Sequence, residues 1–158
     1  VKNRFRIGAA TSAYAYASGP PELLRQSAAL SALAVAPGGK RAVTAGKTFI
    51  ASSMLKTTSN SPAAMTHMAV GTSSTAPAAG DTTLGAEVGR VALASSTSSA
   101  NVVTYTATFP AGTGTGALVE AGILNAASAG TLLCRTTFSV VNKGAADAMS
   151  ITWTITVS

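Results

Sequence analysis

The chain of 158 residues is poor in the side chains that most enzymes, metal sites and disulfide frameworks use. It has one cysteine, Cys134, which excludes a disulfide within the chain and a metal cage built from cysteines. It has one histidine, His67, and charged residues make up 10% of the chain, against about a quarter in ordinary domains. Because no run of 18 apolar residues occurs, the sequence predicts no membrane-spanning helix.

Alanine, threonine, serine and glycine take the place of the missing residue types. The hydrophobic fraction of 47% overstates the core, because much of it is alanine, which buries little area. Threonine favours strands, so this composition predicts β structure. A composition with so few charges is also typical of proteins that pack into large assemblies. The length suits one domain with its own core.

Positive charge gathers at the N-terminal end. Residues 1–56 carry eight basic side chains and one acidic one, a net charge of +7, whereas residues 57–158 carry three and four, a net charge of −1. A basic arm on a neutral body favours an acidic partner, either nucleic acid or an acidic protein surface. A segment that is simply solvated is the alternative. The basic residues expected at an interface are Lys2, Arg4, Arg6, Arg25, Lys40 and Arg41.

The arm, residues 1–60, is expected to hold one or two short helices. The segment ELLRQSAALSALAVA follows Pro21 and ends at Pro37-Gly38-Gly39, which predicts a helix over residues 22–36. A second, amphipathic helix is predicted from Phe49, Ile50, Met54 and Leu55. The basic start of the arm has only Ala, Tyr, Thr and Ser behind it, so we expect no secretory signal.

Residues 61–158 predict an antiparallel β-sandwich, which makes the chain mainly β. Short strands are expected at residues 65–70, 88–95, 101–109, 117–124, 131–141 and 149–158, with a loop at 71–85. The last segment, MSITWTITVS, is the clearest because apolar and hydroxyl side chains alternate along it. The alternation predicts that one set faces the core: Met149, Ile151, Trp153, Ile155 and Val157.

Two glycine-containing segments resemble nucleotide-binding loops but lack required residues. In GTGTGALVEAGILNA (112–126) the third glycine of a dinucleotide fingerprint is replaced by Ala117, and Gly122 disfavours the helix that must follow. In GKT (46–48) the first glycine of a P-loop is replaced by Arg41. The three alternating glycines therefore predict a turn between two strands.

Candidate catalytic groups are few and scattered. His67 lies in a predicted strand, and spacing alone does not exclude a triad with Cys134 or a serine, but no local signature surrounds either residue. Glu120 and Asp147 are far apart in the sequence, and nothing pairs them as acid and base. The sequence predicts that the protein is not an enzyme and has no catalytic residue, cofactor or metal. Cys134, within LLCRTTF, is expected to be a small buried hydrophobe.

A succession of short motifs from Ser61 onward resembles a known family. The motifs are AVGT (69–72), GDTTLGAEVGR (80–90), GALVEAGILNA (116–126), LLCRTTF (132–138) and ITWTITV (151–157). In this order they resemble the small structural proteins of tailed bacteriophages that share the attachment module at the N-terminus of tail-fibre and tail-collar proteins. The resemblance covers about two thirds of the chain and leaves out residues 1–40.

The resemblance implies a non-enzymatic structural protein of the virion, assembled in the host cytoplasm. It implies a tail-fibre, baseplate or collar attachment module that docks on other virion proteins, and a small symmetric homo-oligomer, with a trimer favoured. It also makes Glu120 a structural or interface acid. Two departures stand out: the family often has Phe where this chain has Leu124, and its fibres continue into a trimeric shaft, whereas this sequence ends at Ser158. We therefore expect a stand-alone module.

Two other functions stay open. A capsid decoration (cement) protein would use the basic arm to clamp neighbouring capsid subunits, burying surface as the arm becomes ordered. A nucleic-acid-binding protein would use the same charges and bind with a strong salt dependence. This last function is less favoured because Phe5, Tyr14 and Tyr16 lie in no recognisable RNA-binding motif. Neither a membrane nor a small-molecule substrate is expected as a partner.

Overall fold

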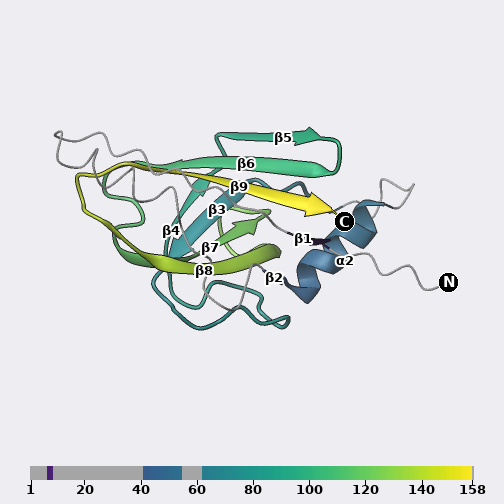
Figure 1. Ribbon diagram of the computed structural model, residues 1–158, viewed down its shortest axis with the longest axis horizontal. Helices are drawn as coiled ribbons and strands as arrows, with labels where there is room; N and C mark the ends of the chain where they lie inside the picture. The colour runs from purple at the N-terminus through teal and green to yellow at the C-terminus, as the bar shows by residue number, and fades with distance from the viewer. Residues whose placement is uncertain (1–6, 9–40, 55–61, 158) are drawn as a thin grey trace.

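The computed structural model describes residues 7–8, 41–54 and 62–157. These residues form two antiparallel β-sheets and one helix (Figure 1). The sheets pack face to face over a shared apolar core, so the chain is mainly β and sandwich-like, as its composition and alternation predict. The helix predicted over residues 22–36 lies outside the described residues.

All neighbouring strands in both sheets are antiparallel. The four-stranded sheet has the order β1 (Ile7–Gly8), β9 (Met149–Val157), β6 (Val102–Phe109) and β5 (Ser95–Ser99). The five-stranded sheet has the order β2 (Arg41–Ala42), β8 (Leu132–Lys143), β7 (Gly116–Leu124), β3 (His67–Gly71) and β4 (Glu87–Ala92). The two shortest strands, β1 and β2, therefore stand at one side of the sandwich, and β4 and β5 stand at the other.

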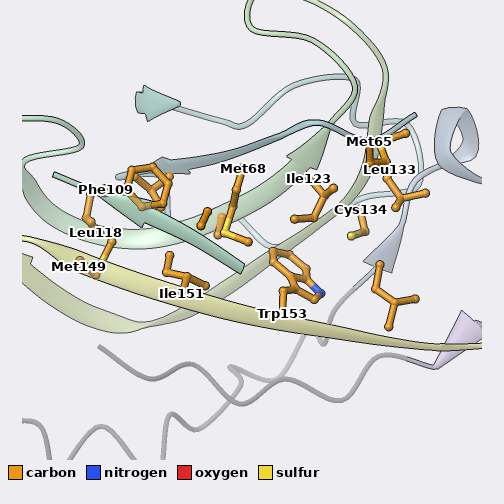
Figure 2. Close-up of a cluster of buried hydrophobic side chains, with 14 residues drawn as sticks. Met65, Met68, Phe109, Leu118, Ile123, Leu133, Cys134, Met149, Ile151 and Trp153 are labelled. Carbon is orange, nitrogen blue, oxygen red and sulfur yellow. The ribbon is translucent and has the colours of Figure 1, made fainter. Parts of the chain in front are cut away.

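The main core lies between the two sheets and is almost wholly apolar. Trp153 from β9, only 1% exposed, packs there beside Ile151, Met68 and Ile123 (Figure 2). The predicted inward set of β9 is confirmed at Met149, Ile151, Trp153 and Ile155, whereas the side chain of Val157 is outside the described part. Cys134 is buried in the same core, as expected for a small hydrophobe. Burying one large apolar side chain contributes about 1.5–3 kcal/mol.

Helix α2 (Thr44–Ser53) lies against β8 at one end of the sandwich. Gly46 permits this close approach, because a Cβ at this position would collide with the backbone carbonyl of Leu133. Phe49 and Ile50 pack on the main core, as the predicted amphipathic helix requires. Met54 instead follows the last helical residue and is 77% exposed, and Leu55, the fourth predicted apolar residue, lies outside the described residues.

A long irregular segment, residues 72–86, connects β3 to β4 and is called the strap here. Its Leu84 packs in a second, smaller apolar cluster with Ala69, Leu124 and Leu132. These strand residues do not belong to the main core, so the strap covers the opposite, outer face of the five-stranded sheet. Gly122 on β7 leaves room for this packing, because a Cβ there would lie 2.7 Å from Leu84 Cδ1.

The turn that contains GTGTG connects β6 to β7, as predicted. Gly112, Gly114 and Gly116 all have positive φ angles, of 78°, 63° and 132°, a region that side chains on L-residues disfavour. One prediction was wrong: the single strand expected at 88–95 is two elements. Strand β4 ends at Ala92, the chain passes to the other sheet, and β5 starts at Ser95.

Candidate functional site: a buried ion-pair network

Three charged side chains meet on the outer face of the five-stranded sheet: Asp81, Glu120 and Arg135, called the ion-pair network here. Arg135 Nε donates to Glu120 Oε2 at 2.7 Å, and Arg135 Nη1 donates to Asp81 Oδ2 at 2.8 Å. Glu120 is 0% exposed and Arg135 is 2% exposed. Full burial of a charged residue is uncommon, and it requires a partner.

The strand register brings the acid and the base together. Arg135 on β8 lies opposite Gly122 on β7, and Glu120 is two residues away on the same face of β7. Side chains at such diagonal positions of neighbouring strands are within reach of each other.

The Glu120 carboxylate also accepts three backbone N–H groups of the strap. Ala86 N donates to Oε1 at 2.7 Å, Gly85 N donates to Oε2 at 2.9 Å, and Ser73 N donates to Oε1 at 3.2 Å. A Cβ on Gly71 would collide with this carboxylate, which explains a glycine at the end of β3. One buried acid therefore holds both ends of the strap on the sheet.

Arg135 and Asp81 attach the middle of the strap. Arg135 Nη2 donates to the Thr75 carbonyl at 2.9 Å. Burial lowers the pKa of Arg135, but its hydrogen bonds to Glu120 and Asp81 outweigh burial and raise the pKa above its ordinary value. Burial raises the pKa of Asp81, but the Ala78 N–H and the Arg135 guanidinium together bring it below its ordinary value of 3.8.

A second ion pair fixes the turn between β7 and β8. Arg90 on β4 pairs with Glu87, with 2.7 Å between Nη2 and Oε2. Arg90 Nη1 also donates to the carbonyls of Ala126 and Ala129, at 2.9 and 2.8 Å. Both carbonyls belong to the β7–β8 turn, so Arg90, like Glu120 and Arg135, binds the backbone of a loop.

The charged groups of the network are occupied by contacts within the chain. Arginine stays protonated at all relevant pH values, and both Glu120 oxygens already accept hydrogen bonds from the chain itself.

His67, the candidate catalytic histidine, lies on β3 with its Nδ1 2.8 Å from Thr66 Oγ1. No group of three or more metal-ligating side chains occurs in the part of the chain that the structure describes. No helix within residues 41–54 and 62–157 has the length and apolar character that crossing a bilayer requires.

Of the seven predicted interface residues, the structure locates only Arg41 and Glu120. Lys2, Arg4, Arg6, Arg25 and Lys40 lie outside the described residues. The backbone of Arg41 pairs with Arg135 in the β2–β8 ladder, and its side chain is not among those described. Glu120 is fully buried within the single chain.

Sequence reasoning missed Asp81 and Arg135 as partners of Glu120. A signal for Arg135 was present, because a charge within the apolar run LLCRTTF predicts a buried, paired arginine.

Comparison of the chain with protein-family models, curated protein sequences and solved structures finds no match.

Proposed function

We propose that the protein is a non-enzymatic structural protein of a tailed-phage virion, an attachment module of the tail fibre, baseplate or collar. One observation supports this most directly. Asp81, Glu120 and Arg135 come from three separate motifs of the resemblance, GDTTL, VEAG and LLCR, and they meet in one buried network. The charged positions of these motifs therefore act together in the fold, as expected if the motifs specify one rigid module.

A rigid module suits a protein that works by docking. The strap is held by five hydrogen bonds or ion pairs from two buried side chains, to Ser73, Thr75, Asp81, Gly85 and Ala86. Directional contacts of this kind fix where a loop lies, and a docking surface requires a fixed shape. The partners would be other virion proteins, and the module itself would be a small homo-oligomer, with a trimer favoured.

A second function, that of a capsid decoration protein, is favoured by the attachment of the arm. The two strands that flank residues 9–40 are both paired with the sandwich, β1 with β9 and β2 with β8. The described residues on either side of this segment therefore belong to the sandwich. A long segment anchored at both ends can cross a neighbouring subunit without losing its attachment.

Immunogold labelling of intact virus particles, with antibody raised against residues 62–157, tests the proposal. Label along the tail or at a single vertex is the expected result for an attachment module. Label spread over the head would replace that function with capsid decoration. Particles without label, beside labelled purified protein as the positive control, would contradict a place in the virion. A gel shift that weakens steeply with salt would instead favour nucleic-acid binding.

A further inference from the structure

A hollow of about 300 Å³ opens between strands β5 and β6, helix α2 and the segment before β3. Phe49, Met65, Val103 and Tyr105 supply its apolar surface, and Ser96, Thr97 and Ser98 of β5 supply its polar side. Consecutive side chains of a strand point to opposite faces. Contact with three consecutive β5 residues therefore means that the hollow reaches the backbone of the strand.

Strand β5 is also an open edge of the four-stranded sheet. In the described part of the chain it pairs with β6 alone, and all five of its residues are exposed. Its sequence, SSTSS, has no charge and no proline, the two features that commonly protect an edge from pairing with another strand. An unprotected edge beside an apolar hollow has the form of sites that bind an extended peptide as an added strand.

The chain's own arm is anchored on the far side of the sandwich. β1 extends the four-stranded sheet beyond β9, and β2 pairs with β8 in the other sheet, whereas β5 stands at the opposite edge (Figure 1). Three strand spacings, roughly 14 Å, separate β1 from β5. A ten-residue extended segment can span this distance, so the choice of a second copy as the occupant rests on the exposure of all five β5 residues in the single chain.

We propose that residues 9–18 of a second copy add to the β5 edge as a strand and place Tyr14 and Tyr16 in the hollow. The segment, AATSAYAYAS, has no charge, which matches a hollow lined by no charged side chain. Tyr14 and Tyr16 are two residues apart, so they share one face of an extended strand. This inference rests on the proposed function, in which copies of the module assemble.

Tyrosine suits the mixed lining of the hollow. Its ring packs on Phe49, Met65 and Tyr105, and its hydroxyl finds partners in Ser96 and Ser98. The donor surface and the acceptor surface are different parts of the chain, so the contact is heterologous and forms a ring when the rotation closes. A closed ring of three copies would give the favoured trimer.

Mixing two full-length variants tests the contact. The donor-deficient variant carries Tyr14→Ser and Tyr16→Ser, and the acceptor-deficient variant carries Ser98→Lys, which puts a charge on the face of β5 that lines the hollow. Sedimentation velocity over a concentration series measures assembly. We expect wild-type oligomers, and each variant alone to have a dissociation constant raised roughly thirtyfold or more. The 1:1 mixture should form a dimer, since one intact donor and one intact acceptor remain.

Two matched variants control for charge and for folding. Val140→Lys puts the same charge on an exposed position of β8, away from the hollow, and should assemble like the wild type. Tyr14→Phe with Tyr16→Phe keeps the rings and should raise the dissociation constant less than the serine variant does. Near-ultraviolet circular dichroism confirms that every variant is folded. Wild-type protein that stays monomeric, variants that assemble unchanged, or a mixture that stays monomeric would overturn the inference. Immunogold labelling would still test the virion function separately.

Discussion

The two faces of the five-stranded sheet differ in the kinds of contact that cover them. The inner face, with residues such as Met68, Val70 and Ile123, packs on the other sheet through apolar contact alone. The outer face has an apolar cluster around Leu84 as well, but it adds Glu120 and Arg135, which hold the strap through directional hydrogen bonds. Apolar burial is non-directional and contributes by area, so the inner face stabilises the sandwich. The outer face fixes the position of one loop.

The faces should also differ in how they respond to substitution. A core side chain can be replaced by another of similar volume at small cost. A buried ion pair behaves differently, because removing one partner leaves an uncompensated charge, whereas replacing both partners by apolar residues is often tolerated. The comparison is sharpest on β7, where Glu120 and Ile123 face opposite sides of one strand.

Glu120→Ala should have the largest effect, a loss of about 3–5 kcal/mol in the free energy of unfolding. It leaves Arg135 buried with Asp81 as its only acid and removes the acceptor of three strap N–H groups. Urea unfolding followed by the fluorescence of Trp153 measures the loss. The double variant Glu120→Leu with Arg135→Met should lose less unfolding free energy than the sum of the losses of Glu120→Leu alone and Arg135→Met alone. Additive losses would mean that the pair is not coupled.

Ile123→Ala, on the other face of the same strand, should cost about 2–5 kcal/mol. The loss comes from transfer of the side chain and from the cavity left between the sheets beside Trp153. Ile123→Val should cost only about 0.5–1.5 kcal/mol, because most of the volume is kept. The same unfolding assay measures both. A smaller loss for alanine than for valine would contradict the close-packed core.

The core between the two sheets is predictable from sequence where its strands follow a period of two. Alternation along β9 is enough to identify Met149, Ile151, Trp153 and Ile155 as core residues. The strap and the ion-pair network are not predictable in this way, because Glu120 and Arg135 are fifteen residues apart and Asp81 lies still further away. Their meeting depends on the β7–β8 register, which shifts at two irregularities that no local pattern encodes. Strand β5 escapes prediction because SSTSS has no apolar alternation.

Gly46→Ala should destabilise the protein, although alanine is the better helix former by about 1 kcal/mol. The new Cβ would collide with the Leu133 carbonyl, so α2 must move off β8, and overpacking of this kind costs about 1–3 kcal/mol. Thermal unfolding measures the effect. Lys47→Ala, one residue further along α2 and exposed, is the matched control and should not lower the melting temperature. A stabilised Gly46→Ala variant would show that the helix does not contact the sheet so closely.

Asp81→Asn should have the smallest effect, about 1 kcal/mol or less at neutral pH, because the Asp81 side chain is 23% exposed and water screens its pairing with Arg135. The sign of its pH dependence follows from the lowered pKa. The folded protein holds the proton less tightly than the unfolded chain, so Asp81 contributes stability at neutral pH, and this contribution is lost as the pH falls below about 4. The difference in unfolding free energy between wild type and Asp81→Asn should therefore shrink between pH 7 and pH 3. A difference that grows on acidification would mean that Arg135 does not stabilise the charged form, and that Glu120 alone holds the strap.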